Sequence, residues 1–332
     1  MNVFELTKRL ISIPSISGDE AGVAHFLADY LESKGFKVEL QEVPEGRPNL
    51  YARKGEPEVV FSSHTDTVPP YVPFREDEEY IYGRGACDAK GIIAAMVKAS
   101  ERLVEENVRD FGLLFVVGEE AGSPGARAAD ESPTGSRYLI NGEPTESKLA
   151  LGSKGALRAF VRTTGRAAHS AYPHLGESAI DKLLDILVDL RRAPFPSDPT
   201  LGATTLNIGM IKGGVAANVI PPEAEAEIML RVVTGTSELK RIIGGILAGR
   251  GDIEYTFACD PVLAESLAGF ETAVVAFTTD IPLLTRWGKP LLFGPGSILD
   301  AHTPHEKISK RELANAVEAY ASMAARLKAE QL

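Results

Sequence analysis

Apolar residues recur with two different spacings along the first half of the chain. They return every three or four positions over residues 3–13 and 21–34, which is typical of amphipathic helices. Shorter apolar runs predict strands at "KVELQEV", "NLYARKG", "EVVFSSHTD" and "FGLLFVVGEE". A Gly-rich turn leads into "CDAKGIIAAMVKASERLVEE", which predicts a further helix. Strands that alternate with helices predict a largely parallel sheet that is covered on both faces.

The pattern changes after "LALGSKGA". The elements predicted next are the strand "LRAFVRTTG", the helix "SAIDKLLDILVDLRR", the strands "TTLNIGMIKGG" and "EAEAEIMLRVV", the helix "SELKRIIGGILAG" and the strand "DIEYTFACDPV". The order β-α-β-β-α-β is that of a ferredoxin-like module. We therefore predict an α/β protein with a catalytic domain over residues 1–156 and 265–332 and an inserted α+β lid over 157–264. A final helix over residues 309–332, with Ser309 as a candidate N-cap, closes the chain.

Length, composition and charge agree with this picture and exclude several classes of protein. A chain of 332 residues is long enough for two domains of about 150 residues each. The net charge of −11 argues against binding to nucleic acid or to an anionic membrane. Cys87 and Cys259 are too far apart in sequence to indicate a disulfide framework or a Cys-rich zinc site. With neither a signal peptide nor a membrane-spanning run in the sequence, we expect a cytoplasmic protein.

Polar residues that can bind metal stand where several predicted strands end. His64 and Asp66 follow the strand "VVF", and a carboxylate two positions after a histidine is well placed to orient a metal-binding imidazole. Glu119 and Glu120 end the next apolar strand, and because successive side chains of a strand point to opposite sides, we expect the two acids to perform separate tasks at one edge. Each residue alone is equally well explained as a turn residue or a helix cap. In open α/β sheets, however, ligands bind at this edge.

Three further candidates complete the set. Asp88 lies in the Gly-rich turn "YGRGACDAKG", Glu143 in "LINGEPT" and His302 in "GPGSILDAHTPHEKIS". With His64 and Glu120 they amount to two imidazoles and three carboxylates, an inventory that suits two neighbouring divalent cations with one bridging carboxylate. Imidazole ligands favour zinc, cobalt or manganese over magnesium or calcium, and zinc is the first choice.

Five motifs in order, "SHTDTVP", "GRGACDAKG", "GEE", "GEPT" and "AHTPHE", resemble the di-zinc amidohydrolase and peptidase family. Acetylornithine deacetylase, succinyl-diaminopimelate desuccinylase, aminoacylase-1 and bacterial glutamate carboxypeptidase are members. The resemblance spans nearly the whole chain. It implies five metal ligands: His64, Asp88, Glu120, Glu143 and His302.

The resemblance also implies a role for each of these groups. Asp88 would bridge both metals and precede a cis peptide bond to Ala89, His64 and Glu143 would complete one metal site, and Glu120 and His302 the other. Asp66 would orient His64. Glu119 would be the general base for a metal-bound hydroxide.

The predicted lid carries three further matches to the family. "GRAAHSAYP" resembles the segment whose histidine stabilises the oxyanion in a partner subunit's active site, which makes His169 the candidate in a homodimer formed through the lid. "GGVAANVIPPEAEAEIMLRV" resembles the stretch that supplies a substrate-contacting Asn, here Asn218, and an Arg that grips the substrate carboxylate, here Arg231. Two segments depart from the family pattern, at His305 and at Phe277 and Thr278 in "FTTDIP", and both departures bear on substrate recognition.

Amide hydrolysis by a metal-dependent enzyme is the predicted reaction. The first hypothesis is a deacylase that removes acetyl or succinyl from an N-acyl-amino acid in amino-acid biosynthesis. Two alternatives stay open, a metallo-exopeptidase that acts on short peptides and a hydrolase that releases amino acids from a carrier protein in lysine or arginine synthesis. A non-catalytic metal-stabilised protein is disfavoured because Glu119 is present. A serine hydrolase is disfavoured because the chain has no G-x-S-x-G motif.

Overall fold

The computed structural model describes residues 1–43 and 46–329, and these residues form two compact units. Unit 1 comprises Met1–Leu151, Leu263–Ala273 and Thr279–Leu332. Unit 2 comprises Gly152–Val262 and Val274–Thr278. The last three residues of the predicted C-terminal helix lie outside the described residues.

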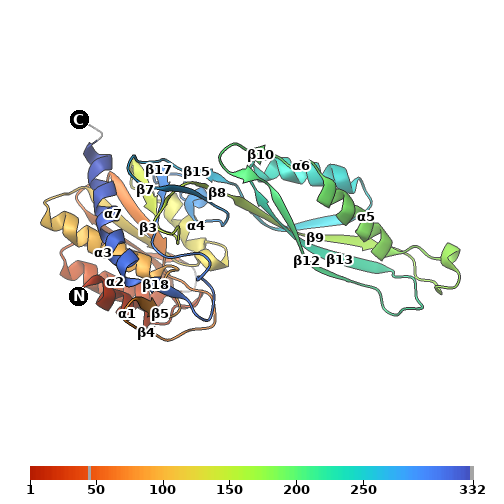
Figure 1. Cartoon of the computed structure of the whole chain (residues 1–332), viewed down its shortest axis with the longest axis horizontal. Coiled ribbons are helices and arrows are strands. Elements are labelled where there is room, and N and C mark those ends of the chain that lie inside the picture. Colours follow the sequence, from red (N-terminus) through yellow and green to blue (C-terminus); the bar gives the residue numbers. More distant parts are fainter. Residues whose placement is uncertain (44–45, 330–332) are drawn as a thin grey trace. The chain divides into compact units, whose positions relative to one another are not determined.

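A nine-stranded sheet forms the centre of unit 1 (Figure 1). Its strands run in the order β1 (Lys37–Val43), β2 (Arg47–Lys54), β6 (Phe111–Val116), β3 (Val59–His64), β7 (Tyr138–Asn141), β17 (Lys289–Leu292), β8 (Leu149–Ser153) and β15 (Val262–Leu263), and β16 (Thr272–Val275) pairs with β8. The inner strands β6, β3, β7 and β17 are parallel. The pairs β1 with β2, β2 with β6 and β17 with β8 are antiparallel. The predicted mainly parallel sheet is therefore confirmed at its centre.

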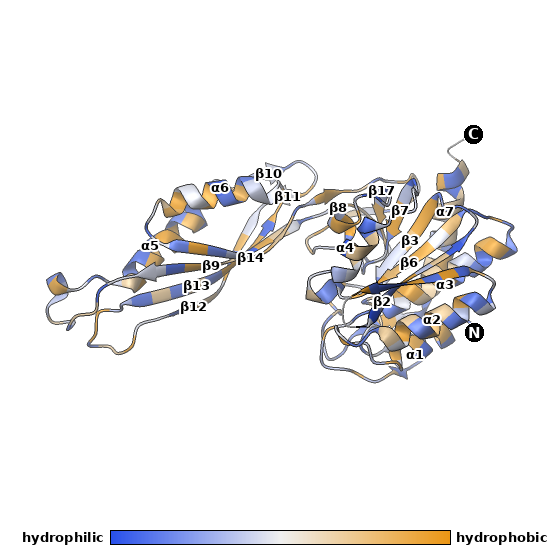
Figure 2. Ribbon diagram, turned by 180° about the vertical axis from the view of Figure 1, so that it is seen from behind, coloured by the Kyte–Doolittle hydropathy of each residue, from blue (hydrophilic) through white to orange (hydrophobic). Residues whose placement is uncertain are grey.

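The central strands β3 and β6 are buried along their whole length because helices cover both faces of the sheet (Figure 2). Side chains alternate along β3, so Phe61 packs against Tyr320 on one face while Val60 joins the core on the other. The helices of unit 1 are α1 (Val3–Ile11), α2 (Ala21–Ser33), α3 (Lys90–Glu105), α4 (Pro124–Glu131) and α7 (Lys310–Ala329). The core residues of α1, α2, α3 and α7 share one cluster, whereas those of α4 share another with the segment 283–287.

Short elements complete unit 1. They are the sheet of β4 (Arg75–Glu76), β5 (Tyr80–Tyr82) and β18 (Lys307–Ser309) and the 3₁₀ turns η1 (Glu119–Ala121) and η3 (Ile281–Leu283). The described part of the chain contains no helix with the length and apolar character that crossing a membrane requires.

Unit 2 has the predicted ferredoxin-like topology. Its main elements are β9 (Gly155–Thr164), α5 (Ala179–Arg192), β12 (Thr205–Gly213), β13 (Glu223–Val232), α6 (Thr236–Leu247) and β14 (Asp252–Cys259). The strands form an antiparallel sheet in the order β12-β13-β9-β14. Buried and more exposed residues alternate along β13, and the buried ones pack against α5 and α6 (Figure 2). The turn η2 (Pro173–Leu175) and the hairpin β10 (Ser197–Asp198) and β11 (Gly202–Ala203) join these elements.

Candidate metal centre

The carboxyl ends of the parallel strands meet at one edge of the unit 1 sheet, and the candidate ligands collect there. His64 is the last residue of β3 and is fully buried. Glu143 follows β7 by two residues and is also buried. Parallel pairing of β3 with both β6 and β7 therefore places ligands that are far apart in sequence at the same edge.

The two adjacent glutamates do not continue β6, so the expectation that they alternate along a strand is wrong. The strand ends at Val116, Gly118 adopts a left-handed conformation with φ of +75°, and Glu119 begins the 3₁₀ turn η1. The reason lies in Asp66, whose Oδ1 accepts the Glu119 N–H at 3.0 Å and whose Oδ2 accepts the Glu120 N–H at 3.1 Å. A carboxylate at this position satisfies amides that would otherwise lack a partner at the start of the turn.

The carboxylate of Asp66 also contacts the side chains of His64 and Ser17. Its Oδ1 lies 3.4 Å from His64 Nδ1, and its Oδ2 accepts a hydrogen bond from Ser17 Oγ at 2.7 Å. Burial favours the neutral acid, but these contacts outweigh it and lower the pKa of Asp66. The sequence did not single out Ser17, which lies outside every motif that carries a candidate ligand.

Asp88 sits between two histidines and directs a different oxygen at each. Its Oδ1 is 3.0 Å from His64 Nε2, and its Oδ2 is 3.1 Å from His302 Nε2. Burial would raise the pKa of Asp88, yet the imidazoles outweigh it and hold that pKa well below its usual range. The peptide bond from Asp88 to Ala89 is cis, as the resemblance implied.

Two overlapping clusters result, and Asp88 belongs to both. One cluster joins Asp88 to His64 and Glu143, and the other joins it to Glu120 and His302. Within each cluster the potential ligand atoms lie within 4.8 Å of one another. In the second cluster, His302 Nε2 lies 2.7 Å from Glu120 Oε1. All five sequence-predicted ligands therefore come together.

The two histidines of the clusters have raised pKa values, and His302 also has an unusual backbone conformation. Its φ of +63° lies in the left-handed region, which is uncommon for a residue other than Gly and often marks a functional site. Hydrogen bonds to Asp88 and Glu120 raise the pKa of His302 to about 10. The pKa of His64 is also raised, because hydrogen bonds to Asp66 and Asp88 outweigh the opposing effect of burial.

The donor set fits divalent cations. Burial raises the pKa of Glu143 well above its usual range, and its Oε1 has no hydrogen-bond partner among the residues that the structure describes. A buried carboxylate oxygen without a partner is costly unless a ligand uses it. Two imidazoles with three carboxylates suit zinc, cobalt or manganese better than magnesium or calcium.

Glu119 belongs to neither cluster, although it is adjacent to Glu120. Burial, followed by the negative charge of Asp280, raises the pKa of Glu119 well above its usual range. Asp280 is itself buried, and burial raises its pKa to about 6. Asp280 was not predicted as a site residue, although it lies in "FTTDIP", the segment where the sequence departs from the family pattern.

In unit 2, His169 and Asn218 lie next to each other. The backbone N–H of Ser170 donates to Asn218 O at 2.9 Å, and His169 forms a β-bridge with Val219. His169 is exposed, and its Nδ1 accepts the Ala171 N–H at 3.1 Å. In the neutral imidazole the proton is therefore on Nε2, which leaves Nε2 as a hydrogen-bond donor to a ligand.

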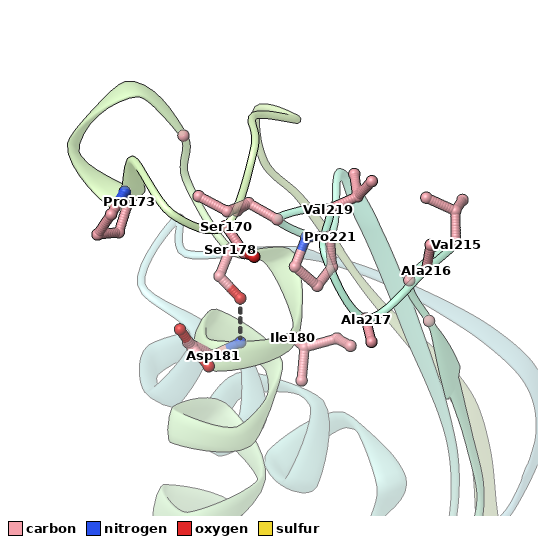
Figure 3. Close-up of a pocket in the computed structure, with 14 residues that line it drawn as sticks. Ser170, Pro173, Ser178, Ile180, Asp181, Val215, Ala216, Ala217, Val219 and Pro221 are labelled. Atoms are coloured by element: carbon pink, nitrogen blue, oxygen red, sulfur yellow. Dashed lines mark hydrogen bonds between the residues drawn. The ribbon is translucent and has the colours of Figure 1, made fainter.

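A pocket of about 640 Å³ lies beside these two residues (Figure 3). The loop 213–221, which contains Asn218, forms one wall, and the start of α5 forms another. In the same view Ser178 caps α5 by accepting the Asp181 N–H at 3.2 Å.

Arg231 stands apart from His169 and Asn218. It is the penultimate residue of β13, whereas His169 and Asn218 lie just beyond the first residue, Glu223. Arg231 lies eight positions after Glu223, and at a rise of about 3.3 Å per residue this corresponds to about 26 Å along the strand. Arg231 is half-buried, and its guanidinium has no ion-pair partner within the described residues.

Comparison with known proteins shows the family of this chain. Residues 60–326 match peptidase family M20/M25/M40. A peptidase M20 domain-containing protein of Schizosaccharomyces pombe is 40% identical over 97% of this chain and 84% of its own length. A probable carboxypeptidase of Emericella nidulans is 38% identical over 95% of this chain and 87% of its own length.

A solved structure, of a tripeptidase from Staphylococcus aureus, shares the fold with a TM-score of 0.82. The match covers 98% of each chain at 20% identity, and at this identity it shows a shared fold only. The family match confirms the expectation of a metal-dependent hydrolase that acts on amide bonds, while leaving the deacylase subfamilies named above unassigned. The chain belongs to peptidase family M20/M25/M40.

Proposed function

We propose that this protein is a metal-dependent exopeptidase that releases the C-terminal residue of short peptides. The observation that carries the proposal is the position of Asp88, whose two oxygens face His64 and His302 at 3.0 and 3.1 Å. One carboxylate thereby serves two clusters of ligands. The Emericella nidulans relative, at 38% identity, is named a probable carboxypeptidase, which favours peptides over N-acyl-amino acids as substrates.

Two divalent cations, with zinc as first choice, would be held by the two clusters. His64 and Glu143 would hold one, Glu120 and His302 the other, and Asp88 both. When bound, the cations polarise the scissile carbonyl and lower the pKa of a water molecule. Asp66 keeps His64 oriented, because its backbone carbonyl accepts a hydrogen bond from His64 Nδ1 at 3.0 Å while Nε2 faces the cluster.

Glu119 is the proposed general base. It accepts a proton from the attacking water and returns it to the nitrogen of the leaving amine. Because it lies outside both clusters, its carboxylate stays available for proton transfer. Burial favours the protonated state of Glu119, so the acid that forms after the first proton transfer is stabilised in this environment.

Arg231 is the proposed group that binds the substrate carboxylate. Its guanidinium has no ion-pair partner among the described residues, and a planar guanidinium matches a carboxylate with two parallel hydrogen bonds. This contact would select substrates with a free C-terminus. N-acyl-amino acids also carry a free carboxylate, so the deacylase hypothesis gives Arg231 the same role.

We also infer a homodimer in which His169 serves the partner's site. Arg231 and the His169 end of unit 2 are about 26 Å apart along β13, which is farther than one amino-acid substrate can reach. One substrate would therefore contact the two groups from different subunits. The edge strand β12 and the neighbouring helix α5 support a lid interface, because they expose Met210, Ile211, Leu184 and Val188.

The proposal is tested with a substrate panel on protein that is stripped of metal and reloaded with zinc, cobalt or manganese. The panel comprises an N-acetylated dipeptide, the same dipeptide with a C-terminal amide, an N-acetyl-amino acid and an N-succinyl-amino acid. We expect kcat/KM to be highest for the N-acetylated dipeptide and to fall sharply when its C-terminus is amidated, because Arg231 then loses its ionic partner. Metal-free protein should not turn over any of them.

Two outcomes would contradict this assignment in different ways. Preferential hydrolysis of the acetyl- or succinyl-amino acid would make the protein a deacylase. Equal rates for the free and amidated dipeptides would remove the proposed role of Arg231. A chain that is inactive on the entire panel with every metal would leave the carrier-protein hydrolase as the candidate.

A further inference from the structure

A buried carboxylate outside the metal clusters holds the turn that presents Asp88. Glu306 lies four residues after His302, and its side chain is completely buried. Its Oε1 accepts the backbone N–H groups of Cys87 and Asp88, each at 3.2 Å. Its Oε2 accepts Arg84 Nη1 at 2.6 Å, and Arg84 is also buried.

These contacts tie together the two chain segments that supply Asp88 and His302. Gly83 N–H donates to Glu306 O at 3.1 Å, and Arg84 Nη1 also donates to Thr303 O at 3.3 Å. Arg84 thus lies between the Asp88 turn and the segment 302–306, with Glu306 as its ionic partner.

Among the described residues, the hydrogen-bonding contacts of the Asp88 carboxylate are with the imidazoles of two other candidate ligands. Within the described residues, its Oδ1 contacts His64 and its Oδ2 contacts His302, both of which are candidate ligands. Metal-binding carboxylates are commonly oriented by outer hydrogen bonds to their own oxygens. Here the backbone N–H groups of residues 87 and 88 are held instead, and both donate to Glu306 Oε1.

We propose that Glu306, held in place by Arg84, is a positioning residue that fixes Asp88 between the two metal positions. This inference rests on the metal sites of the proposed function. A buried ion pair adds little stability compared with apolar residues of similar volume, so its value at this junction is orientation. Since Asp88 faces both clusters, a change at Glu306 affects both metals, whereas a change at Glu120 affects only one.

The test is calorimetric titration of zinc into metal-free Glu306→Gln protein. A glutamine has a single acceptor oxygen, so it cannot accept from Arg84 on one side and from two backbone amides on the other. We expect both zinc affinities to fall by about 10–100-fold, the usual loss when an outer partner of a metal ligand is removed. Glu120→Gln is the reference for loss at one site only. The visible absorption of the cobalt-loaded variant should shift, which reports altered ligand geometry independently of turnover.

Asp130→Asn is the matched control for a stability effect. Asp130 Oδ1 accepts the Arg286 N–H at 2.8 Å and its Oδ2 accepts Thr285 Oγ at 2.9 Å, so it too anchors a distant loop through a carboxylate. Asp130→Asn should lower the melting temperature of the metal-free protein while both zinc affinities stay unchanged.

Three results separate the inference from the proposed function. Unchanged zinc affinities in Glu306→Gln, or weakening at one site only, would overturn the positioning role. A wild-type protein that binds no zinc, cobalt or manganese would instead overturn the metal centre itself. If Glu306→Gln does not fold, Arg84→Lys serves as the second test, because lysine keeps the positive charge but loses the planar guanidinium. We expect Arg84→Lys to weaken zinc binding at both sites. Unchanged zinc affinities in this variant would also contradict the positioning role of Glu306.

Discussion

At the scale of single residues, the turn after β6 separates two neighbouring acids into different tasks. Asp66 accepts both backbone amides of the pair, and the turn directs the Glu120 carboxylate to His302 at 2.7 Å. Glu119 lies in neither cluster of ligands. The two side chains therefore differ in their partners even though they have the same chemistry and adjacent positions.

This separation predicts opposite phenotypes for two identical substitutions. Glu119→Gln should keep both metals and lose turnover by about 10²–10⁴-fold, the usual contribution of a general acid–base group. Glu120→Gln should lose metal from one site, because an amide is a weaker ligand than a carboxylate. Metal content and kcat are measured on the same samples. Equal metal loss in both variants would contradict the division of roles.

At the scale of secondary structure elements, the close approach of α4 to the end of β6 positions the η1 turn. Gly125, in the first turn of α4, donates its N–H to Val117 O at 3.1 Å. A Cβ at this position would lie 2.5 Å from Val117 N, Val117 O and Asn49 Oδ1. Val117 precedes the two glutamates by two residues, so a displacement of the first turn of α4 at Gly125 reaches them.

Gly125→Ala should therefore destabilise the protein by about 1–3 kcal/mol, the usual cost of overpacking, and should lower kcat as well. The control is Gly244→Ala in α6, where a Cβ would have no neighbour within 4 Å. That substitution should stabilise by about 0.4–1 kcal/mol, because alanine restricts the unfolded chain. Denaturant unfolding and kcat test both, and a Gly125→Ala protein with wild-type stability would contradict the packing argument.

At the scale of the whole molecule, the proposed dimer predicts that two inactive variants restore activity when combined. In a heterodimer of His169→Ala and Glu119→Gln chains, one site receives Glu119 from the first chain and His169 from the second. Random pairing makes half the dimers mixed, with one intact site each, so about one quarter of the wild-type sites should return. Absence of any recovery, with heterodimers verified by mass, would count against His169 acting in the partner's site.

Much of the fold follows from local patterns in the sequence. The predicted strands ending in "HTD" and "EE" form β3 and β6, and the module order β-α-β-β-α-β is present in unit 2. The exact end of β6 does not follow from local pattern, since Val117 is as apolar as the strand before it. The strand ends because side chains from distant parts of the chain accept the amides that follow it: Asn49 Oδ1 accepts the Val117 N–H, and Asp66 accepts those of Glu119 and Glu120.

The sequence by itself determined which residue types could hold metal, because imidazoles and carboxylates at predicted strand ends and turns carry that chemistry wherever they are placed. Only the tertiary structure decided how they combine, with Asp88 shared between His64 and His302 and Glu119 outside both clusters. It also brought in Ser17, which lies outside the quoted motifs, and Arg84, Asp280 and Glu306, which lie inside quoted segments but had no predicted role. The physical reason is range: periodicity and capping act over a few neighbouring residues, whereas hydrogen bonds and charge in the site join residues as far apart as Asp88 and Glu306.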